Sequence, residues 1–247
     1  MLSAKPYYLL GADEAGRGCL VGDLVMSVVG AAVHQLPFSQ DGEIQETIFL
    51  SPQIQTLFHP SGKIQDSKAF HREEDRWEVA DEIWSHIHDG RIWMAMRERT
   101  SREVDDSRNI NNCVNNAWID CVDEIVQRIL TTDPSAEQDQ RIYVIIDGNS
   151  FCKTMRCPFR NVVRADALFP CVSAASILAK CAHDDSIDRI LRSADSEEER
   201  KRWEVDFGWL ENKGYATKKH REAIEKYGPT IHHRMSFEPC KSWNRKV

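Results

Sequence analysis

Three short apolar runs each lead into acidic residues, and this pattern constrains the fold more than any other feature of the chain. The runs and their acids are residues 7–11 with Asp13 and Glu14, residues 140–146 with Asp147, and residues 161–164 with Asp166. A short apolar run bounded by polar residues indicates a buried strand. Because strand ends in an α/β sheet converge on one edge, we expect the four carboxylates to lie together there.

The remaining periodicity predicts two further strands and four helices. The strands are expected at residues 24–33 and 91–100, and the helices at residues 72–88, 111–130, 171–191 and 217–227. Thr217 is the expected N-cap of the last helix and Gly228 its end. This order predicts a mixed, five-stranded α/β sheet flanked by helices, with a helical C-terminal extension.

The expected domain organisation is a catalytic domain over residues 1–194 and a small helical substrate-binding lobe over residues 195–247. Residues 35–63 are rich in proline and polar residues, which predicts a surface insertion in the first domain.

Charge is unevenly distributed between these parts. The 247-residue chain carries −7 overall, but residues 211–247 hold nine Lys or Arg against four Asp or Glu, a local +5. A basic segment beside an acidic body can hold a phosphate backbone. Composition alone equally allows an ordinary solvated surface.

Composition also bears on location. The chain has no run of 18 apolar residues, so no membrane span is expected. Residues 1–6 do not resemble a secretory signal, and the eight cysteines form no CxxC pair. We therefore expect reduced, buried thiols without a zinc site, in a cytoplasmic or nuclear protein, with the cytoplasm as the expected location.

The acids themselves suggest a metal site. A single Asp at a strand end is more often a cap or a turn residue. Four converging carboxylates, however, repel one another unless cations neutralise them, and oxygen-only ligands favour Mg²⁺ or Mn²⁺. Two such ions ~3.5–4 Å apart are the usual device for phosphodiester hydrolysis.

The motifs around the acids resemble those of the type 2 ribonuclease H family. They occur in the family's order and span most of the chain: GADEAGRG at 11–18, DSK at 66–68, DGN at 147–149, ADA at 165–167, VSAASILAK at 172–180, KGYAT at 213–217 and HRMSF at 233–237. The resemblance implies a ribonuclease-H-like sheet with a small helical C-terminal lobe.

The resemblance also implies an activity and its residues. The catalytic, metal-holding residues would be Asp13, Glu14, Asp147 and Asp166, with two Mg²⁺ or Mn²⁺ ions. A self-sufficient monomer would cut the RNA-containing strand of RNA–DNA hybrids and incise DNA duplexes 5′ of single embedded ribonucleotides. The substrate-binding residues would be Gly16, Arg17 and Gly18 at the 2′-hydroxyl, Tyr215 against the neighbouring sugar, and Ser67, Lys68 and Lys180 near phosphates. Lys180 could equally be a structural ion-pair partner.

The chain departs from the family pattern at three positions near these motifs. Cys19 and Asp23 stand where the family often has proline, and His183 stands where arginine is common. None of these departures removes a predicted metal ligand, but they leave the loop conformation and the substrate preference open.

Three rival interpretations make different demands on the sequence. A nuclease of the same fold acting on DNA alone would need neither residues 16–18 nor Tyr215. A catalytically inactive nucleic-acid-binding subunit would lack one of the carboxylates. A small-molecule hydrolase would not predict the basic C-terminal segment.

Overall fold

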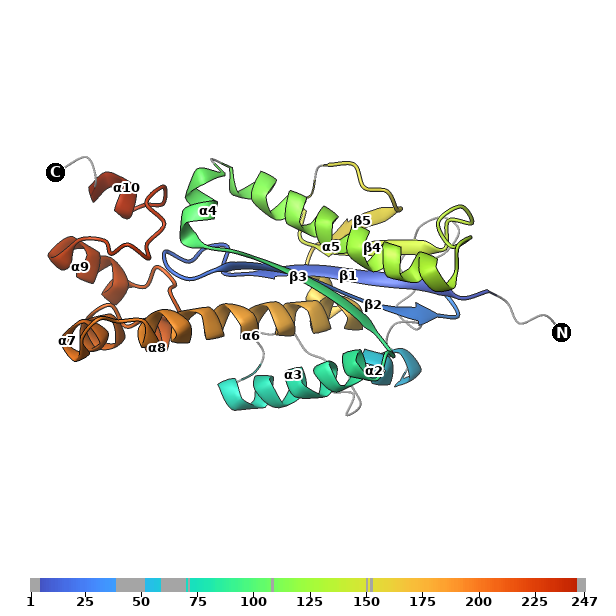
Figure 1. Ribbon diagram of the computed structural model, residues 1–247, viewed down its shortest axis with the longest axis horizontal. Helices are drawn as coiled ribbons and strands as arrows, with labels where there is room; N and C mark the ends of the chain where they lie inside the picture. Colours follow the sequence, from blue (N-terminus) through green and yellow to red (C-terminus); the bar gives the residue numbers. More distant parts are fainter. Residues whose placement is uncertain are drawn as a thin grey trace. The chain divides into compact units, whose positions relative to one another are not determined.

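The computed structural model describes residues 5–38, 52–58, 70, 72–107, 109–149, 151 and 153–243, and its central element is a five-stranded sheet (Figure 1). The strands are β1 (Tyr7–Ala15), β2 (Leu24–Val33), β3 (Trp93–Arg99), β4 (Ile142–Asp147) and β5 (Phe159–Val162). Their order is β3-β2-β1-β4-β5, with β1 parallel to β4 and β4 parallel to β5. All five strands predicted from the sequence are present within a few residues of their expected bounds.

Strand β1 is longer than predicted. The expected strand stopped at Gly11, whereas β1 continues to Ala15, so Asp13 and Glu14 lie within it. β1 is the central strand, between β2 and β4, so its backbone has a partner on both sides. The small residues Ala12 and Ala15 keep the extension buried around the acids. The expectation that the acids follow the strand was therefore wrong for this pair.

Helices cover both faces of the sheet, with α5 on one face and α3 and α6 on the other in Figure 1. The helices are α2 (Pro52–Phe58), α3 (Glu73–His88), α4 (Ser101–Asp106), α5 (Ile110–Thr132), α6 (Pro170–Arg192), α7 (Glu197–Lys201), α8 (Trp209–Asn212), α9 (Lys218–Tyr227) and α10 (Cys240–Trp243), with a 3₁₀ turn at Ala165–Ala167 and a π turn at Arg202–Asp206. None of those described is long and apolar enough to cross a bilayer.

The predicted boundaries of α9 are confirmed. The Thr217 side chain accepts the N–H of His220 at 3.3 Å, and Gly228 ends the helix with a φ of 80°. Of the predicted insertion at residues 35–63, residues 39–51 and 59–63 lie outside the described residues. The described remainder includes α2, whose Phe58 is fully buried.

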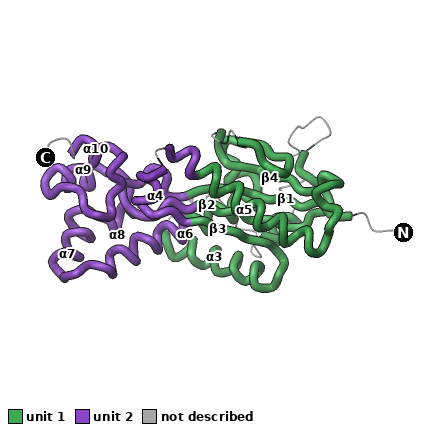
Figure 2. Tube along the Cα trace, turned by 45° about the horizontal axis from the view of Figure 1, so that its top comes forward, with its two compact units in different colours: residues 1–14, 26–97, 114–179 green, residues 15–25, 98–113, 180–247 purple. Residues whose placement is uncertain are grey.

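The chain divides into two compact units, coloured separately in Figure 2. Unit 1 comprises Met1–Glu14, Met26–Arg97 and Val114–Ala179, and it holds all four predicted metal-binding acids. Unit 2 comprises Ala15–Val25, Glu98–Cys113 and Lys180–Val247. The functional domain boundary expected between residues 194 and 195 stays a prediction.

Unit 2 joins the segment after β1 to the C-terminal residues. Its core packs Leu20 and Val21 together with Trp203, Phe207 and Trp209. The Leu20 N–H donates to the carbonyl of Gly214 at 2.8 Å, so the two segments also share backbone hydrogen bonds. Residues 16–18 and Tyr215, which lie far apart in sequence, therefore belong to one folded unit.

Candidate active site

Strands β1 and β4 carry two of the predicted acids side by side. Their parallel register aligns Ala12 with Ile146, so the next residue along each strand is Asp13 on β1 and Asp147 on β4. Residues opposite one another on neighbouring strands point to the same face of a sheet. The side chains of Asp13 and Asp147 therefore share one face at the carboxyl end of β4.

Asp13 lies in an environment that disfavours its charge. It is only 6% exposed, and its carboxylate accepts the N–H of Glu14 at 2.7 Å and a hydrogen bond from the side chain of Ser176 on α6. Burial, followed by the charge of Glu14 and then that of Asp147, raises the pKa of Asp13 well above its usual value. A carboxylate held like this gains most from a nearby cation.

A hydrogen bond connects the end of β4 to the turn that carries Asp166. Oδ1 of Asp147 accepts the N–H of Ala165 at 2.7 Å. The next residue, Asp166, is 7% exposed, and its Oδ1 accepts the N–H of Ala167 at 3.0 Å. Asp166 directly follows Ala165, so the 3₁₀ turn connects it to the residue whose N–H binds Asp147. Backbone N–H groups orient both carboxylates.

These carboxylates are gathered without forming a closed cage. Throughout the part of the chain that the structure describes, no three His, Cys, Asp or Glu side chains converge closely enough to hold an ion. The donor set nevertheless consists of carboxylate oxygens alone, which suits a hard divalent cation. Burial and the neighbouring charges of Glu14 and Asp147 disfavour the ionised form of Asp13, and a cation would offset both, so the residues fit such an ion.

The predicted 2′-hydroxyl loop, residues 16–18, lies in unit 2, and a buried arginine binds its backbone. Gly16 has a φ of 81°, which glycine adopts without strain. The fully buried Arg234 donates to the carbonyl of Gly16 at 2.7 Å and to that of Gly22 at 2.8 Å. Arg17 donates to Asn111 Oδ1. Apart from its two chain neighbours, no described residue lies within 4 Å of a Cβ built on Gly18, so this part of the loop is open to an approaching group.

Tyr215 and Lys180 meet in the same unit. Tyr215 is 37% exposed, and the Lys180 ammonium lies 5.3 Å from the centre of its ring, within the range of a cation–π contact. Lys180 also pairs with the buried Asp184 at 2.5 Å. The structural ion pair that the sequence allowed for Lys180 is therefore present, while its role at a phosphate stays a prediction.

Ser67 and Lys68 lie outside the described residues, so their roles stay predictions. The sequence prediction was incomplete in two respects. Ser176 contacts Asp13 but was not predicted, although a serine within the apolar face of the helix at 171–191 is a usable signal. Arg234 was quoted only as part of a motif, because its partner Gly16 lies 218 positions away and no local pattern reveals the contact.

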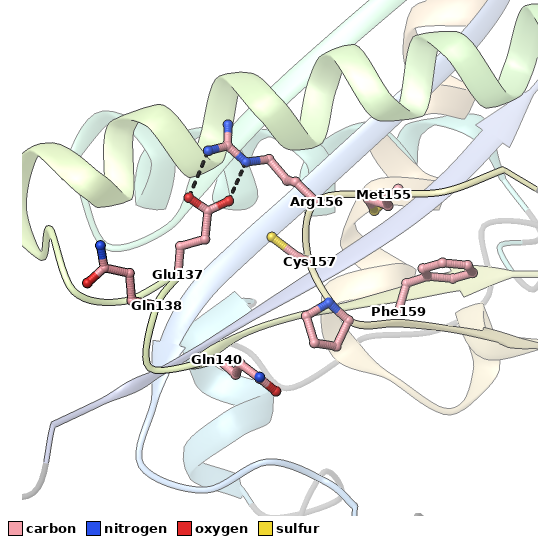
Figure 3. A pocket seen from close by; sticks show the side chains of 8 residues that line it. Glu137, Gln138, Gln140, Met155, Arg156, Cys157 and Phe159 are labelled. Atoms are coloured by element: carbon pink, nitrogen blue, oxygen red, sulfur yellow. Dashed lines mark hydrogen bonds and ion pairs between the residues drawn. The ribbon is translucent and has the colours of Figure 1, made fainter.

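A hollow of about 600 Å³ lies elsewhere in unit 1, and Figure 3 shows it; it is lined by Glu137, Gln138, Gln140 and residues 155–159. Glu137 and Arg156 at its edge are bound to each other by two hydrogen bonds of 2.7 and 2.9 Å. Burial raises the pKa of Cys157 to about 12, so this thiol is not a nucleophile at neutral pH. None of the four predicted metal-binding acids lines this hollow.

Solved structures share the arrangement of the sheet and helices. Ribonuclease H2 from Pyrococcus horikoshii OT3 matches with a TM-score of 0.58 at 19% identity, covering 97% of this chain and 98% of that one. Bst-RNase HIII in complex with Mn²⁺ matches with a TM-score of 0.63 at 16% identity, covering 100% and 74%. The fold is thus that of the ribonuclease-H-like enzymes, as expected from the motifs.

Sequence comparison narrows this class to one family. The profile described as ribonuclease HII matches residues 10–240. Ribonuclease HII of Christiangramia forsetii is 32% identical over 228 residues, which are 92% of this chain and 89% of the relative. The chain belongs to the ribonuclease HII family and is a ribonuclease H, which confirms the resemblance seen in its motifs.

Proposed function

We propose that this enzyme cuts the RNA-containing strand of RNA–DNA hybrids and incises duplex DNA on the 5′ side of a single embedded ribonucleotide. Membership of the ribonuclease HII family supports endonuclease action on hybrids. The observation that carries the catalytic part is the pairing of Asp13 with Asp147 on neighbouring parallel strands, next to Glu14. Small-molecule hydrolysis and a binding-only role account less well for these features.

The proposed metal ligands are Asp13, Glu14, Asp147 and Asp166, holding two Mg²⁺ or Mn²⁺ ions. A solved relative of the same fold, Bst-RNase HIII, was crystallised in complex with Mn²⁺. Bound divalent ions supply an activated water at neutral pH and stabilise charge on the leaving oxygen.

The chain's own contribution to this site is orientation and burial. The Glu14 N–H and Ser176 hold the carboxylate of Asp13, while the Ala165 N–H holds that of Asp147. Because these carboxylates are fixed before any ligand arrives, little reorganisation is needed during the reaction.

In the proposed function, recognition of the ribonucleotide depends on the unit 2 loop at residues 16–18 and on Tyr215. The loop begins two residues after Glu14, so the peptide chain itself keeps it within reach of a predicted metal ligand. Backbone at Gly18 can approach a sugar closely, and a 2′-hydroxyl is what distinguishes RNA from DNA. When the 2′-hydroxyl is missing, the enzyme's polar group that would bind it is left without a partner. This costs about 1–3 kcal/mol of interaction free energy and disfavours an all-DNA duplex.

The proposed setting is the cytoplasm, with the enzyme acting as a monomer. The seven cysteines within the described residues are all free and buried, as expected for reduced thiols.

The test uses three duplexes of one sequence, with no ribonucleotide, one ribonucleotide, or a run of at least four in one strand. We expect cleavage of the second and third in Mg²⁺, loss of cleavage with a chelator, and little cleavage of the first. Asp147→Asn should abolish cleavage, whereas Asp81→Asn, which changes an exposed acid on α3, should not. Cleavage of the run alone would refute recognition of single ribonucleotides, and equal cleavage of the all-DNA duplex would refute the proposal.

A further inference from the structure

The three positions at which the chain departs from its family are in contact with one another. Sγ of Cys19 lies 3.3 Å from Nε2 of His183. Nδ1 of the same imidazole lies 2.7 Å from the carbonyl oxygen of Asp23. Cys19 and Asp23 bracket the short segment after residues 16–18, and His183 comes from α6, so one side chain connects both ends of that segment.

The His183 ring also contacts the segment that carries Tyr215. It is fully buried, and its Nε2 lies 3.0 Å from the carbonyl oxygen of Lys213. Its ring centre lies 6.0 Å from that of Tyr215, edge to face at 72°. Cys19 adds a backbone bridge to Tyr215. The imidazole and the thiol together thus connect the 2′-hydroxyl loop to the tyrosine.

The His183 ring packs directly against Gly16 and Gly22. A Cβ built on Gly16 would lie 2.5 Å from Nδ1 of His183, and one built on Gly22 would lie 3.2 Å from its Cε1. The loop therefore packs against the imidazole, and Arg234 binds the carbonyls of Gly16 and Gly22. A shift of the ring would move Gly16 and Tyr215 relative to each other.

Both bridging groups are uncharged at neutral pH. Burial lowers the pKa of His183 and raises the pKa of Cys19 to about 12. A neutral imidazole has one N–H, which donates to the Asp23 carbonyl when it is on Nδ1. Nε2 then has only a lone pair, which can accept the thiol of Cys19 but cannot donate to the Lys213 carbonyl. The bridge therefore runs from the loop through His183 to Cys19, whose backbone pairs with Tyr215.

We propose that His183 and Cys19 are positioning residues that set Tyr215 against the Gly16–Gly18 loop and so determine how well a single ribonucleotide is recognised. The inference rests on the proposed function, because it concerns the same loop and tyrosine. Neither residue touches substrate in this account. Both act through groups on the surface above them.

The expected effect follows from the geometry of recognition. A displacement of about 1 Å in a positioning group can cost on the order of 100-fold in rate. A duplex with one ribonucleotide offers a single 2′-hydroxyl, so its cleavage depends on the loop and tyrosine acting at one nucleotide. A continuous hybrid offers several 2′-hydroxyls in neighbouring registers and tolerates the displacement better.

The experiment measures kcat and KM on both substrates for His183→Asn, Cys19→Ala and Cys19→Ser. Asparagine keeps a donor for the Asp23 carbonyl but cannot reach Cys19 or Tyr215. The quantity compared is kcat/KM on the single-ribonucleotide duplex divided by kcat/KM on the hybrid. We expect this ratio to fall by at least roughly tenfold in His183→Asn, mainly through a lower kcat on the single-ribonucleotide duplex. It should fall about threefold in Cys19→Ala and be retained in Cys19→Ser, whose hydroxyl can still donate to Nε2.

Two matched variants control for the loss of a buried side chain. His86→Gln changes a buried histidine that binds the Leu57 carbonyl in unit 1, and Cys240→Ala changes a buried cysteine in the unit 2 core. Both should keep the ratio within about twofold, since general destabilisation lowers cleavage of both substrates together. An unchanged ratio in both His183→Asn and Cys19→Ala would overturn this inference while leaving the proposed function intact. If the unmodified enzyme cannot cut the single-ribonucleotide duplex, both proposals fall.

Discussion

Acidification should destabilise unit 2 through two buried histidines of its core. Nδ1–H of His220 donates to the carbonyl of Tyr215 at 2.9 Å, and its Nε2 accepts the indole N–H of Trp209 at 3.0 Å. Nδ1 of His233 accepts the N–H of Thr230 at 2.9 Å, and its Nε2 lies 3.1 Å from that of His220. Each histidine uses a lone pair that protonation would remove, so the folded unit requires both to be neutral.

The magnitude follows from the pKa shifts. Burial lowers the pKa of His220 to about 4, and burial together with the charge of His220 lowers the pKa of His233 to about 3. A depressed folded-state pKa gives stability that is present above the unfolded pKa, about 6.5, and is lost as the pH falls below it. Between pH 7 and pH 5 each histidine should cost about 2 kcal/mol of unfolding free energy, or about 4 kcal/mol together.

Urea unfolding at pH 7 and pH 5, followed by the intrinsic tryptophan fluorescence to which Trp203 and Trp209 of unit 2 contribute, measures this loss. The double variant His220→Asn/His233→Asn should be less stable at pH 7 but lose less than about 1 kcal/mol on acidification. The control His88→Asn changes an exposed histidine of α3 and should keep the full dependence on pH. The reasoning is refuted if the unmodified protein and the double variant lose the same free energy.

Three further substitutions test other parts of the structure. Asp13→Asn should raise the melting temperature measured with a chelator present, because it removes a buried carboxylate whose pKa is raised by burial and by Glu14. The same variant should abolish cleavage. A lower melting temperature would contradict the first expectation. Arg234→Leu should cost about 3 kcal/mol or more in urea unfolding, since it leaves buried carbonyls such as that of Gly16 without their charged donor; a loss under about 1 kcal/mol would show that the loop holds without it. Gly11→Ala should cost about 1–3 kcal/mol, because its Cβ would lie 2.4 Å from the backbone of Cys171 on α6, and calorimetry showing no change would contradict the close packing of β1 on α6.

The sequence was most informative where local pattern and chemistry coincide. Apolar runs leading into acids identified the strands that carry Asp13 and Asp147, because a strand and its exit residue are encoded within ten positions. The same reasoning stopped β1 too early, since it treats an acid as the end of a strand. Asp13 breaks the apolar pattern inside a central strand, as expected for the role proposed for it.

Contacts between distant segments of the chain could not be predicted from the sequence alone. His183 and Cys19 are 164 positions apart, and the departures at these two positions were visible without any sign that the side chains touch. Arg234 likewise reaches Gly16 only in the folded unit. Such contacts depend on the packing of α6 and the C-terminal segment around residues 16–23, which no local periodicity specifies.

The chemistry of the cut ends tests the central claim most directly. If the proposed carboxylates hold divalent ions that supply an activated water, attack on the phosphate 5′ of a lone ribonucleotide would leave a 3′-hydroxyl and a 5′-phosphate. Attack by the ribonucleotide's own 2′-hydroxyl would instead break the bond on its 3′ side and leave a cyclic phosphate. A duplex with one ribonucleotide, labelled at either end and cut in Mg²⁺, should therefore give a single incision 5′ of that ribonucleotide, a 3′ end that a polymerase extends and a 5′ end that carries phosphate. Products ending in a cyclic or 3′-phosphate, or cut on the 3′ side, would contradict catalysis by Asp13, Glu14, Asp147 and Asp166.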